Sequence, residues 1–446
     1  MKFKKAREVI SIIERQGYSA LMVGGAVRDL VMQRPVTDID LATDMPMDQL
    51  AGIFVSRDIG KSKDFGMLNV EYQGEQFEVS GMSRGGACFD QHISADAKKR
   101  LLFGMDARRR DFTINAMAMD AQGLILDPLE GRTDIADKII RTVRAPDEVF
   151  KADTLRLLRA VRFACALGFG IEPKTLGAIR RLCPTISASA PERIGRELIN
   201  LASLVGKIFA EGLCLMEETG LLEQILPEIS RLRGFDHDPG HHPEGGVYNH
   251  TLAALKAGEK ADPRINLSIL FHDCGKPGTF DLKNGRPAYR RHDKAAEAVI
   301  LDAGQRLKLP AKLVEVMCFV AANHMKGQRI GEMKPSRAFR LMTHPEWPVL
   351  KAAIWCDLQA RSVQKASIFE RDVAEIIRNL GQWMDRENRK ARPVVTGRQV
   401  MEYTGLPQGP EVGRILEQVT SWAIDNHITD EQEIRKYVIN CKPLAK

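Results

Sequence analysis

The chain has 446 residues, a formal net charge of +7 and a pI near 8.9. This length corresponds to about three domains of typical size, and the positive charge favours a polyanionic partner. The 8 cysteines are scattered and form no Cys-x-x-Cys pair. This pattern predicts free thiols in a reducing cytoplasm and excludes a disulfide framework or a zinc ribbon. We expect no signal peptide and no membrane span, because the N-terminal segment is amphipathic and charged.

The first informative feature is a double glycine, Gly24-Gly25, directly after a predicted buried strand over 18–23. Without a Cβ atom the main chain can pack against a polyphosphate. Arg28 is expected to open the following helix, where its guanidinium can fork onto phosphate oxygens.

Two aspartates follow. Asp38 and Asp40 are two positions apart in a predicted strand over 37–43, so both carboxylates should project from one face. Hard oxygen ligands in this arrangement suit Mg²⁺. Two such ions would activate a 3′-hydroxyl and stabilise the leaving pyrophosphate, so the sequence predicts metal-dependent nucleotidyl transfer. Glu78 is expected in a hairpin of strands 67–72 and 76–82, either as a third ligand or as an exposed carboxylate.

The rest of the chain carries mostly helical patterns after Asp147. The segment 234–246 is dense in Gly, Pro, His and Asp and is the clearest predicted linker, and a charged segment over 385–392 precedes a final helical piece. The expected loop over 84–100 is long enough to be functional.

Together these segments resemble a known family. The order Gly-Gly-Ala-Val-Arg-Asp at 24–29 and Arg-Pro-Val-Thr-Asp-Ile-Asp at 34–40 is similar to the signature of tRNA nucleotidyltransferases and bacterial poly(A) polymerases, within the DNA polymerase β superfamily. The run over 108–116 resembles a family block in which the arginine matching Arg110 meets the triphosphate or ribose. The run over 127–134 resembles the hinge between head and neck, which shapes the backbone and carries no chemistry.

The segment over 152–164 resembles the one with which the family reads the incoming base without a nucleic-acid template, through residues matching Asp153 and Arg156. Cytosine and adenine each offer an amino donor beside a ring-nitrogen acceptor, which suits a carboxylate beside a guanidinium, whereas uracil and guanine reverse that order. Helical spacing predicts that Asp153, Arg156 and Arg159 share one face. The opposite face should bury Leu155, Leu158 and Val161. Arg159 and Arg162 are expected to be phosphate or structural partners, and Ala152 stands where glutamate is common in the family.

A second site is predicted around His272-Asp273-Cys274-Gly275-Lys276-Pro277, which resembles the core of HD-domain phosphohydrolases. The metal ligands implied by this resemblance are His250, His272, Asp273 and Asp357. Imidazole ligands favour a divalent transition metal over Mg²⁺. His292 and His324 are expected nearby as satisfied, partly buried histidines. Such a domain can hydrolyse 2′,3′-cyclic or terminal phosphates in some relatives, or it can serve packing or dimerisation.

The resemblance implies an α+β fold, with a polymerase β-like mixed-sheet head followed by an all-helical neck, HD body and tail. The expected ranges are 1–145 for the head, 146–235 for the neck that reads nucleotides and binds RNA, 236–365 for the HD body and 366–446 for the tail. The residues expected at the nucleotide are Gly24, Gly25, Arg28, Arg110, Asp153, Arg156, Arg159 and Arg162.

The implied activity is addition of the 3′-terminal CCA, or its terminal A, to tRNA from CTP and ATP, with Mg²⁺ in the head. A poly(A) polymerase of the same family is the first alternative, and the HD domain argues against it. The second alternative is an HD phosphohydrolase whose head merely binds RNA; Asp38, Asp40 and Arg110 argue against that. The sequence leaves the oligomeric state open, including a homodimer.

Overall fold

The computed structural model describes residues 2–57, 66–82, 93–236, 245–380 and 394–441. The chain divides into two compact units. The first comprises Met1–Glu197 and Cys214–Ile225, and the second comprises Leu198–Leu213 and Leu226–Lys446. Within the described ranges, every helix is too short or too polar to cross a membrane.

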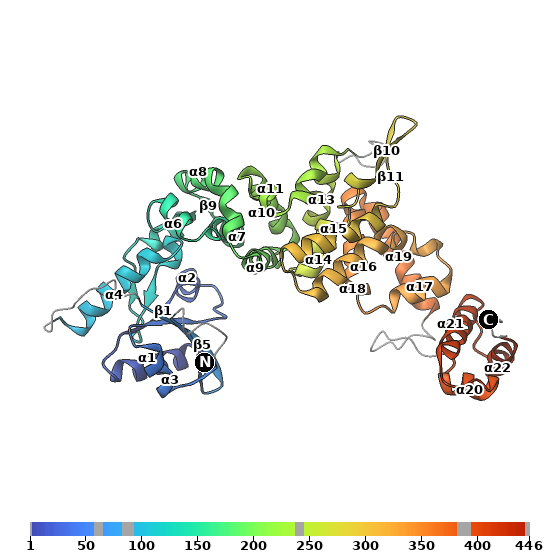
Figure 1. The fold of residues 1–446 in the computed structure, drawn as a ribbon, viewed down its shortest axis with the longest axis horizontal. Helices are drawn as coiled ribbons and strands as arrows, with labels where there is room; N and C mark the ends of the chain where they lie inside the picture. Colours follow the sequence, from blue (N-terminus) through green and yellow to red (C-terminus); the bar gives the residue numbers. More distant parts are fainter. Residues whose placement is uncertain (1, 58–65, 83–92, 237–244, 381–393, 442–446) are drawn as a thin grey trace. The chain divides into compact units, whose positions relative to one another are not determined.

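The first unit contains a seven-stranded sheet with the order β3-β4-β5-β2-β1-β6-β7, drawn in blue and cyan in Figure 1. β2 and β5 run parallel, whereas the other neighbouring strands are antiparallel. The strands are β1 (Ala20–Val23), β2 (Asp40–Thr43), β3 (Val55–Arg57), β4 (Met67–Tyr72), β5 (Glu75–Gly81), β6 (Ala118–Met119) and β7 (Ile125–Leu126).

The interior strand β1 is buried on both faces, and its alternating side chains enter two different cores. Ala20 and Met22 pack with α1 (Lys2–Arg15) and α3 (Met47–Ile53). Leu21 and Val23 pack with α4 (Ala95–Arg109). The sheet is therefore covered on both faces, and chemistry has to take place at its edges and strand ends.

The helices after the sheet begin with α5 (Gly131–Ala136) and α6 (Pro146–Ala152), and a short parallel pair joins β8 (Ile139–Ile140) to β9 (Gly170–Ile171). The remaining elements up to residue 230 are helical. They are α7 (Arg156–Leu167), α8 (Pro173–Leu182), α9 (Pro191–Ala202), α10 (Gly206–Glu218), α11 (Leu221–Ile225) and α12 (Pro227–Ser230).

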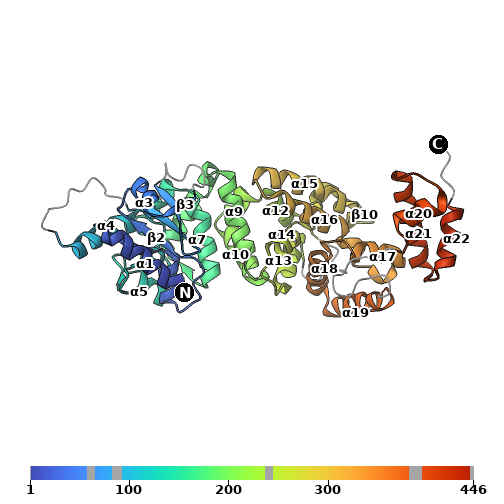
Figure 2. The ribbon, with the colours of Figure 1, turned by 90° about the horizontal axis from the view of Figure 1, so that it is seen from below.

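Among its described residues, the second unit is helical apart from one hairpin, β10 (Phe280–Lys283) with β11 (Arg286–Tyr289). Figure 2 shows its helices in green to red. Its body contains α13 (Val247–Ala257), α14 (Pro263–Phe271), α15 (His292–Arg306), α16 (Ala311–Gly327), α17 (Pro335–Met342), α18 (Trp347–Arg361) and α19 (Val363–Asn379). The last three helices share their own apolar core. They are α20 (Gly397–Thr404), α21 (Pro410–Asp425) and α22 (Glu431–Asn440).

This architecture confirms the predicted fold class and the predicted hairpin, β4 with β5. Two strand predictions were too long, because β1 begins at Ala20 and β2 begins at Asp40. The segment before β2 is instead held by α1, since Lys2 Nζ donates to the carbonyl oxygen of Thr37 over 2.7 Å. Most of the predicted linker, the charged segment 385–392 and the part of the 84–100 loop before residue 93 lie outside the described residues; α4 occupies the end of that loop.

Candidate functional sites

The double glycine forms the turn between β1 and α2 (Gly25–Val31). Gly24 has a φ of 72°, in the left-handed region that favours glycine, and its N–H donates to Met117 O over 3.1 Å. A Cβ at Gly24 would lie 3.3 Å from Nη1 of Arg110, and one at Gly25 would lie 3.5 Å from Nη2 of Arg28. Two guanidinium groups therefore lie against this turn.

Arg28 does not open its helix as predicted; it is the fourth residue of α2. Its side chain is mostly buried and donates to Asp29 over 2.9 and 3.0 Å and to Asn115 Oδ1 over 2.7 Å. Burial lowers the pKa of Arg28, and the charge of Asp29 opposes this shift. Because protein groups occupy its fork, Arg28 fixes the glycine turn to the segment that carries Asn115.

Asp40 begins β2 and is aligned with Glu78 of the parallel strand β5. Burial raises the pKa of Asp40; the charge of Arg110 opposes this shift and that of Asp38 adds to it. Burial also raises the pKa of Glu78, and Asp40 adds to that shift. Carboxylates whose neighbours resist their ionisation are characteristic of cation sites, because a bound cation removes the repulsion.

Asp38 lies just before β2 and its side chain is 88% exposed, with Lys2 Nζ 3.3 Å from Oδ1. Buried Ile39 separates it from exposed Asp40, which agrees with the predicted alternation. Across the described ranges, groups of three ligand atoms within 4.8 Å occur in the second unit only. The head carboxylates therefore lie at the start of β2 and on the adjacent strand β5 without being drawn together into one group.

Arg110 is oriented by Asp106, a residue that sequence reasoning missed. The Asp106 carboxylate is fully buried near the end of α4 and accepts from Arg109 Nε over 2.6 Å and from Arg110 Nε over 3.0 Å. The available signal was an acid four residues before a family arginine, a spacing that brings the two side chains together if the segment is helical. Asp106 holds the Arg110 guanidinium beside Gly24.

Asp111 connects the head to α7. It accepts from Arg159 Nε over 2.9 Å and Nη2 over 2.6 Å. Burial raises the pKa of Asp111, but the charge and hydrogen bonds of Arg159 outweigh it and lower that pKa overall. Arg162 Nε donates to Glu197 over 2.5 Å. Of the two alternatives for Arg159 and Arg162, this geometry favours the structural one.

The predicted common helix face of Asp153, Arg156 and Arg159 is wrong, because α7 begins at Arg156. Asp153 has extended angles, φ −155° and ψ 104°, at the end of α6. Its carboxylate accepts from Arg193 over 2.8 and 3.2 Å, a partner 40 residues away that no local pattern indicates.

Arg156 donates to the carbonyl oxygen of Arg109 over 2.7 Å. Burial lowers the pKa of Arg156, while the charges of Asp111 and Asp153 oppose that shift. The predicted apolar face of the helix is confirmed by the burial of Leu155, Leu158 and Val161.

The predicted hinge motif shapes the backbone. The Asp127 carboxylate accepts from the N–H groups of Gly131 over 2.7 Å and Arg132 over 2.9 Å at the start of α5. Glu130 has a φ of 58°, and a Cβ at Gly131 would overlap the carbonyl oxygen of Thr113. These contacts account for the motif without any catalytic role.

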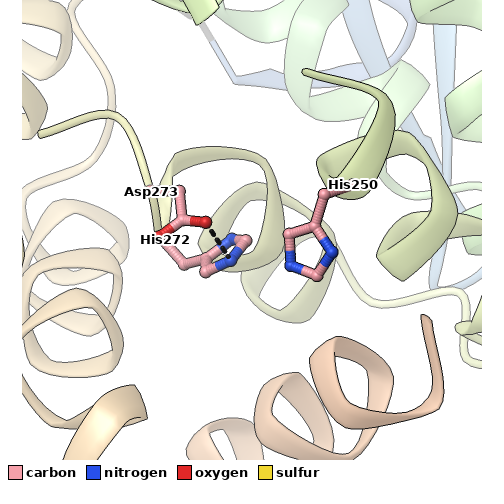
Figure 3. A group of neighbouring side chains, drawn as sticks. All are labelled: His250, His272 and Asp273. Atoms are coloured by element: carbon pink, nitrogen blue, oxygen red, sulfur yellow. Dashed lines mark ion pairs between the residues drawn. The ribbon is translucent and has the colours of Figure 1, made fainter. Parts of the chain in front are cut away.

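The HD motif lies at the centre of the second unit. His250 comes from α13, while His272 and Asp273 follow α14, and all three are buried (Figure 3). His272 Nε2 lies 3.1 Å from Asp273 Oδ2. His250 Nε2 lies 2.8 Å from Oδ1 of Asp357, which α18 contributes. Three of the four predicted ligands, His250, His272 and Asp273, therefore form one group of ligand atoms, and Asp357 contacts this group through His250.

His292 and His324 lie beside the predicted ligands and have hydrogen-bond partners, as expected, and their ligand atoms also form a group with Asp273. Nδ1 of His272, His292 and His324 lies 2.7 to 2.9 Å from a backbone carbonyl oxygen. Nδ1 carries a proton there, so a neutral ring in this orientation would offer the lone pair of Nε2 to a metal. The Nε2 atoms of His292 and His324 lie 3.3 and 3.8 Å from Asp273 Oδ1.

Protonation and charge also suit metal binding. Burial lowers the pKa of His324 to about 3, which keeps this imidazole neutral. Two groups of three ligand atoms share Asp273: His250, His272 and Asp273, and Asp273, His292 and His324. Carbonyl-anchored imidazoles around one carboxylate are typical of metal ligands and their supporting contacts.

Buried cations hold the two HD-site carboxylates. Lys276 Nζ lies 2.6 Å from Asp273, and Arg361 Nη2 lies 2.6 and 2.7 Å from the oxygens of Asp357. Burial raises the pKa of both aspartates. His272 and Lys276 outweigh this effect at Asp273, and Arg361 and His250 outweigh it at Asp357. The pKa of each aspartate is therefore held well below its usual value. Both aspartates are therefore anions in the interior.

Comparisons with known proteins agree with these sites. Residues 20–141 match the family described as "Poly A polymerase head domain", and residues 168–232 match "Probable RNA and SrmB- binding site of polymerase A". The head thus belongs to a class of nucleotidyltransferases.

The chain is 30% identical to the CCA-adding enzyme of Geobacillus thermodenitrificans over 97% of its own length and 95% of the relative's. It is 30% identical to the multifunctional CCA protein of Halorhodospira halophila over 72% of this chain and 76% of that protein. The crystal structure of Bacillus stearothermophilus CCA-adding enzyme in complex with CTP superposes with a TM-score of 0.67 and 26% identity, covering 98% of this chain and 96% of the other. The chain belongs to the CCA-adding tRNA nucleotidyltransferase family, which confirms the predicted resemblance.

Proposed function

We propose that the head adds C and A to the 3′ end of tRNA from CTP and ATP, with Asp38 and Asp40 as catalytic metal ligands. The observation that carries this proposal is the placement of Arg110 against Gly24 in the strand–turn–helix step beside the Asp40 strand. Poly(A) synthesis is the alternative within the family.

The head residues fit Mg²⁺. Asp40 and Glu78 are aligned carboxylates with raised pKa values, and exposed Asp38 adjoins them. When bound, Mg²⁺ supplies charge stabilisation to the phosphates and the 3′-hydroxyl. Gly24 and Gly25 admit the polyphosphate, and Arg110 faces its charge. Glu78 is proposed as a supporting carboxylate.

Base selection is proposed to rest on Asp153 and Arg156. Each side chain already holds a protein partner, Arg193 for Asp153 and the Arg109 carbonyl for Arg156, so both are positioned before a nucleotide arrives. The carboxylate would accept from the amino group of cytosine or adenine and the guanidinium would donate to the ring nitrogen.

The direct test uses purified protein and tRNA transcripts that lack A, CA or CCA at the 3′ end, each incubated with one nucleotide. We expect CTP to extend the shortest transcript by two residues and ATP to extend only the transcript that ends in CC. Long ATP-dependent tails on every transcript would support the poly(A) alternative instead.

We also infer that the HD cluster binds divalent transition-metal ions and hydrolyses terminal or 2′,3′-cyclic phosphates on RNA ends. The convergence of three carbonyl-anchored imidazoles on Asp273 supports this second function. Metal analysis of protein loaded with Mn²⁺ or Ni²⁺, followed by assay on a 2′,3′-cyclic phosphate RNA, tests it. Protein that retains no metal above a His272→Ala variant would contradict it.

The proposed domain ranges remain 1–145, 146–235, 236–365 and 366–446. A cytoplasmic location is proposed from the scattered cysteines. For the oligomeric state, sedimentation of the purified chain distinguishes a monomer from a homodimer.

A further inference from the structure

A basic pocket lies between α16 and α17, away from the residues of the HD cluster. Its volume is about 600 Å³, within the usual range for ligand sites. Glu332 is its one acidic lining residue among those described. Its basic lining residues are Lys326, Arg329, Lys334, Arg337 and Arg340.

Most of these cations are not neutralised by the protein. Arg329, Lys334 and Arg337 are exposed and form no ion pair with any residue in the described ranges. Arg340 pairs with Glu417 over 2.7 Å, where both side chains are more than 60% exposed, so this pair is weak. The contrast with Arg159 and Arg162, which buried acids hold, indicates that the pocket cations are available to an external anion.

The pocket also has an aromatic wall. The rings of Phe319 and His344 stack at 3.8 Å between centroids with an interplanar angle of 11°. Phe319 is half-buried and His344 is exposed, so the outer ring presents a flat face. Flat rings beside cationic side chains are the combination that binds bases and phosphates of single-stranded nucleic acid.

We propose that this pocket binds a nucleotide unit, with its base on the Phe319–His344 stack and its phosphates on Arg329, Lys334 and Arg337. The shared chemistry is a base with attached phosphate, which either an RNA strand or a free nucleoside triphosphate supplies. The pocket lies outside residues 168–232, which match the RNA-binding description, and outside the head.

The test compares two charge-reversal variants of the full chain. Arg329→Glu/Arg337→Glu alters the pocket, and Lys365→Glu/Arg378→Glu makes the same charge change at exposed positions of α19 outside it. Fluorescence anisotropy with labelled tRNA lacking CCA gives the dissociation constant across a salt series. We expect the pocket variant to bind at least ten-fold more weakly than the control variant, with a salt slope smaller in magnitude by about 1.4 to 1.8 for two lost phosphate contacts.

Photo-crosslinking with 8-azido-ATP, mapped to peptides that contain Phe319 or His344, tests the other source. If these peptides are labelled in the control variant but not in the pocket variant, and both variants bind tRNA equally, the ligand is a free nucleotide. His344→Ala should weaken binding of the identified ligand by about five- to ten-fold without changing the salt slope, because stacking carries no charge. Equal tRNA affinities for both variants together with no labelling of these peptides would overturn the proposal. Because all substituted residues are exposed, thermal melting should be unchanged.

Discussion

The two candidate sites differ in the exposure of their charged residues and in the contacts that these residues make. In the head, Asp38 and Asp40 are exposed at the start of β2, where Lys2 contacts Asp38, and Arg110 lies against the glycine turn. In the HD cluster, every ligand is buried and already in contact with a neighbour. The head therefore needs nucleotide and metal to complete its site, whereas the protein interior has assembled the HD cluster in advance. Removing one ligand should cost activity in the head and metal binding in the body.

The largest effect is expected at the open site. Asp40→Asn should reduce nucleotide addition to below a few per cent of wild type while tRNA binding persists, because the charge that holds Mg²⁺ is lost. Single-turnover extension of tRNA lacking CCA measures this, and Asp48→Asn on α3, also exposed, is the matched control. Residual addition well above that level would remove Asp40 from the catalytic site.

For the HD cluster we expect the opposite phenotype, in which metal binding is weakened and CCA addition is unchanged. Asp357→Asn should weaken metal binding by about 10- to 100-fold, because the group that orients His250 loses its charge. Titration with Mn²⁺ followed by metal analysis gives the affinity, while CCA addition should match wild type. Asp281→Asn, on the exposed β10 strand, is the control. If CCA addition fell in parallel with metal content, the two sites would not be independent.

Loss of the Asp111–Arg159 ion pair between head and neck should have an intermediate effect, measured as a change in stability. Asp111→Asn should lower the free energy of unfolding by about 3 kcal/mol, because Arg159 loses its buried partner. Folding lowers the pKa of Asp111. Its carboxylate therefore contributes fully to the stability of the fold at pH values above the pKa that it has in the unfolded chain. This contribution is lost as the pH falls through the pKa of Asp111 in the folded protein. Denaturant titrations between pH 7 and pH 3 should show less acid destabilisation in the variant than in wild type. Equal pH dependence in both proteins would contradict this assignment.

The smallest effect concerns selectivity. Arg156→Ala should relax discrimination against UTP and GTP by about ten-fold, since a polar contact in a desolvated site contributes roughly 1 to 3 kcal/mol. Single-turnover rates with four nucleotides measure this. Arg156 also donates to Arg109 O, so a uniform loss for all nucleotides would show that it only braces the head. Arg144→Ala, a mainly exposed pair partner of Glu148, is the control.

The sequence predicted several features that depend on neighbours in the chain. Alternating side chains gave the β4–β5 hairpin, because strand burial has a period of two, and the glycine pair marked a turn that needs a positive φ. The short motifs also identified the family, and they predicted four HD residues of which three form one group of ligand atoms. These features follow from local stereochemistry or from residue order.

Only tertiary structure decided which distant side chains meet. His292 and His324 joined the HD cluster through Asp273, 19 and 51 residues earlier in the chain. Asp153 accepts a hydrogen bond from Arg193, which is 40 residues later in the chain. Because α7 begins at Arg156, Asp153 does not lie on the predicted helix face. The packing of helices determines which of these distant side chains are in contact. The spacing of a histidine along one helix does not indicate which carboxylate a second helix will place beside it.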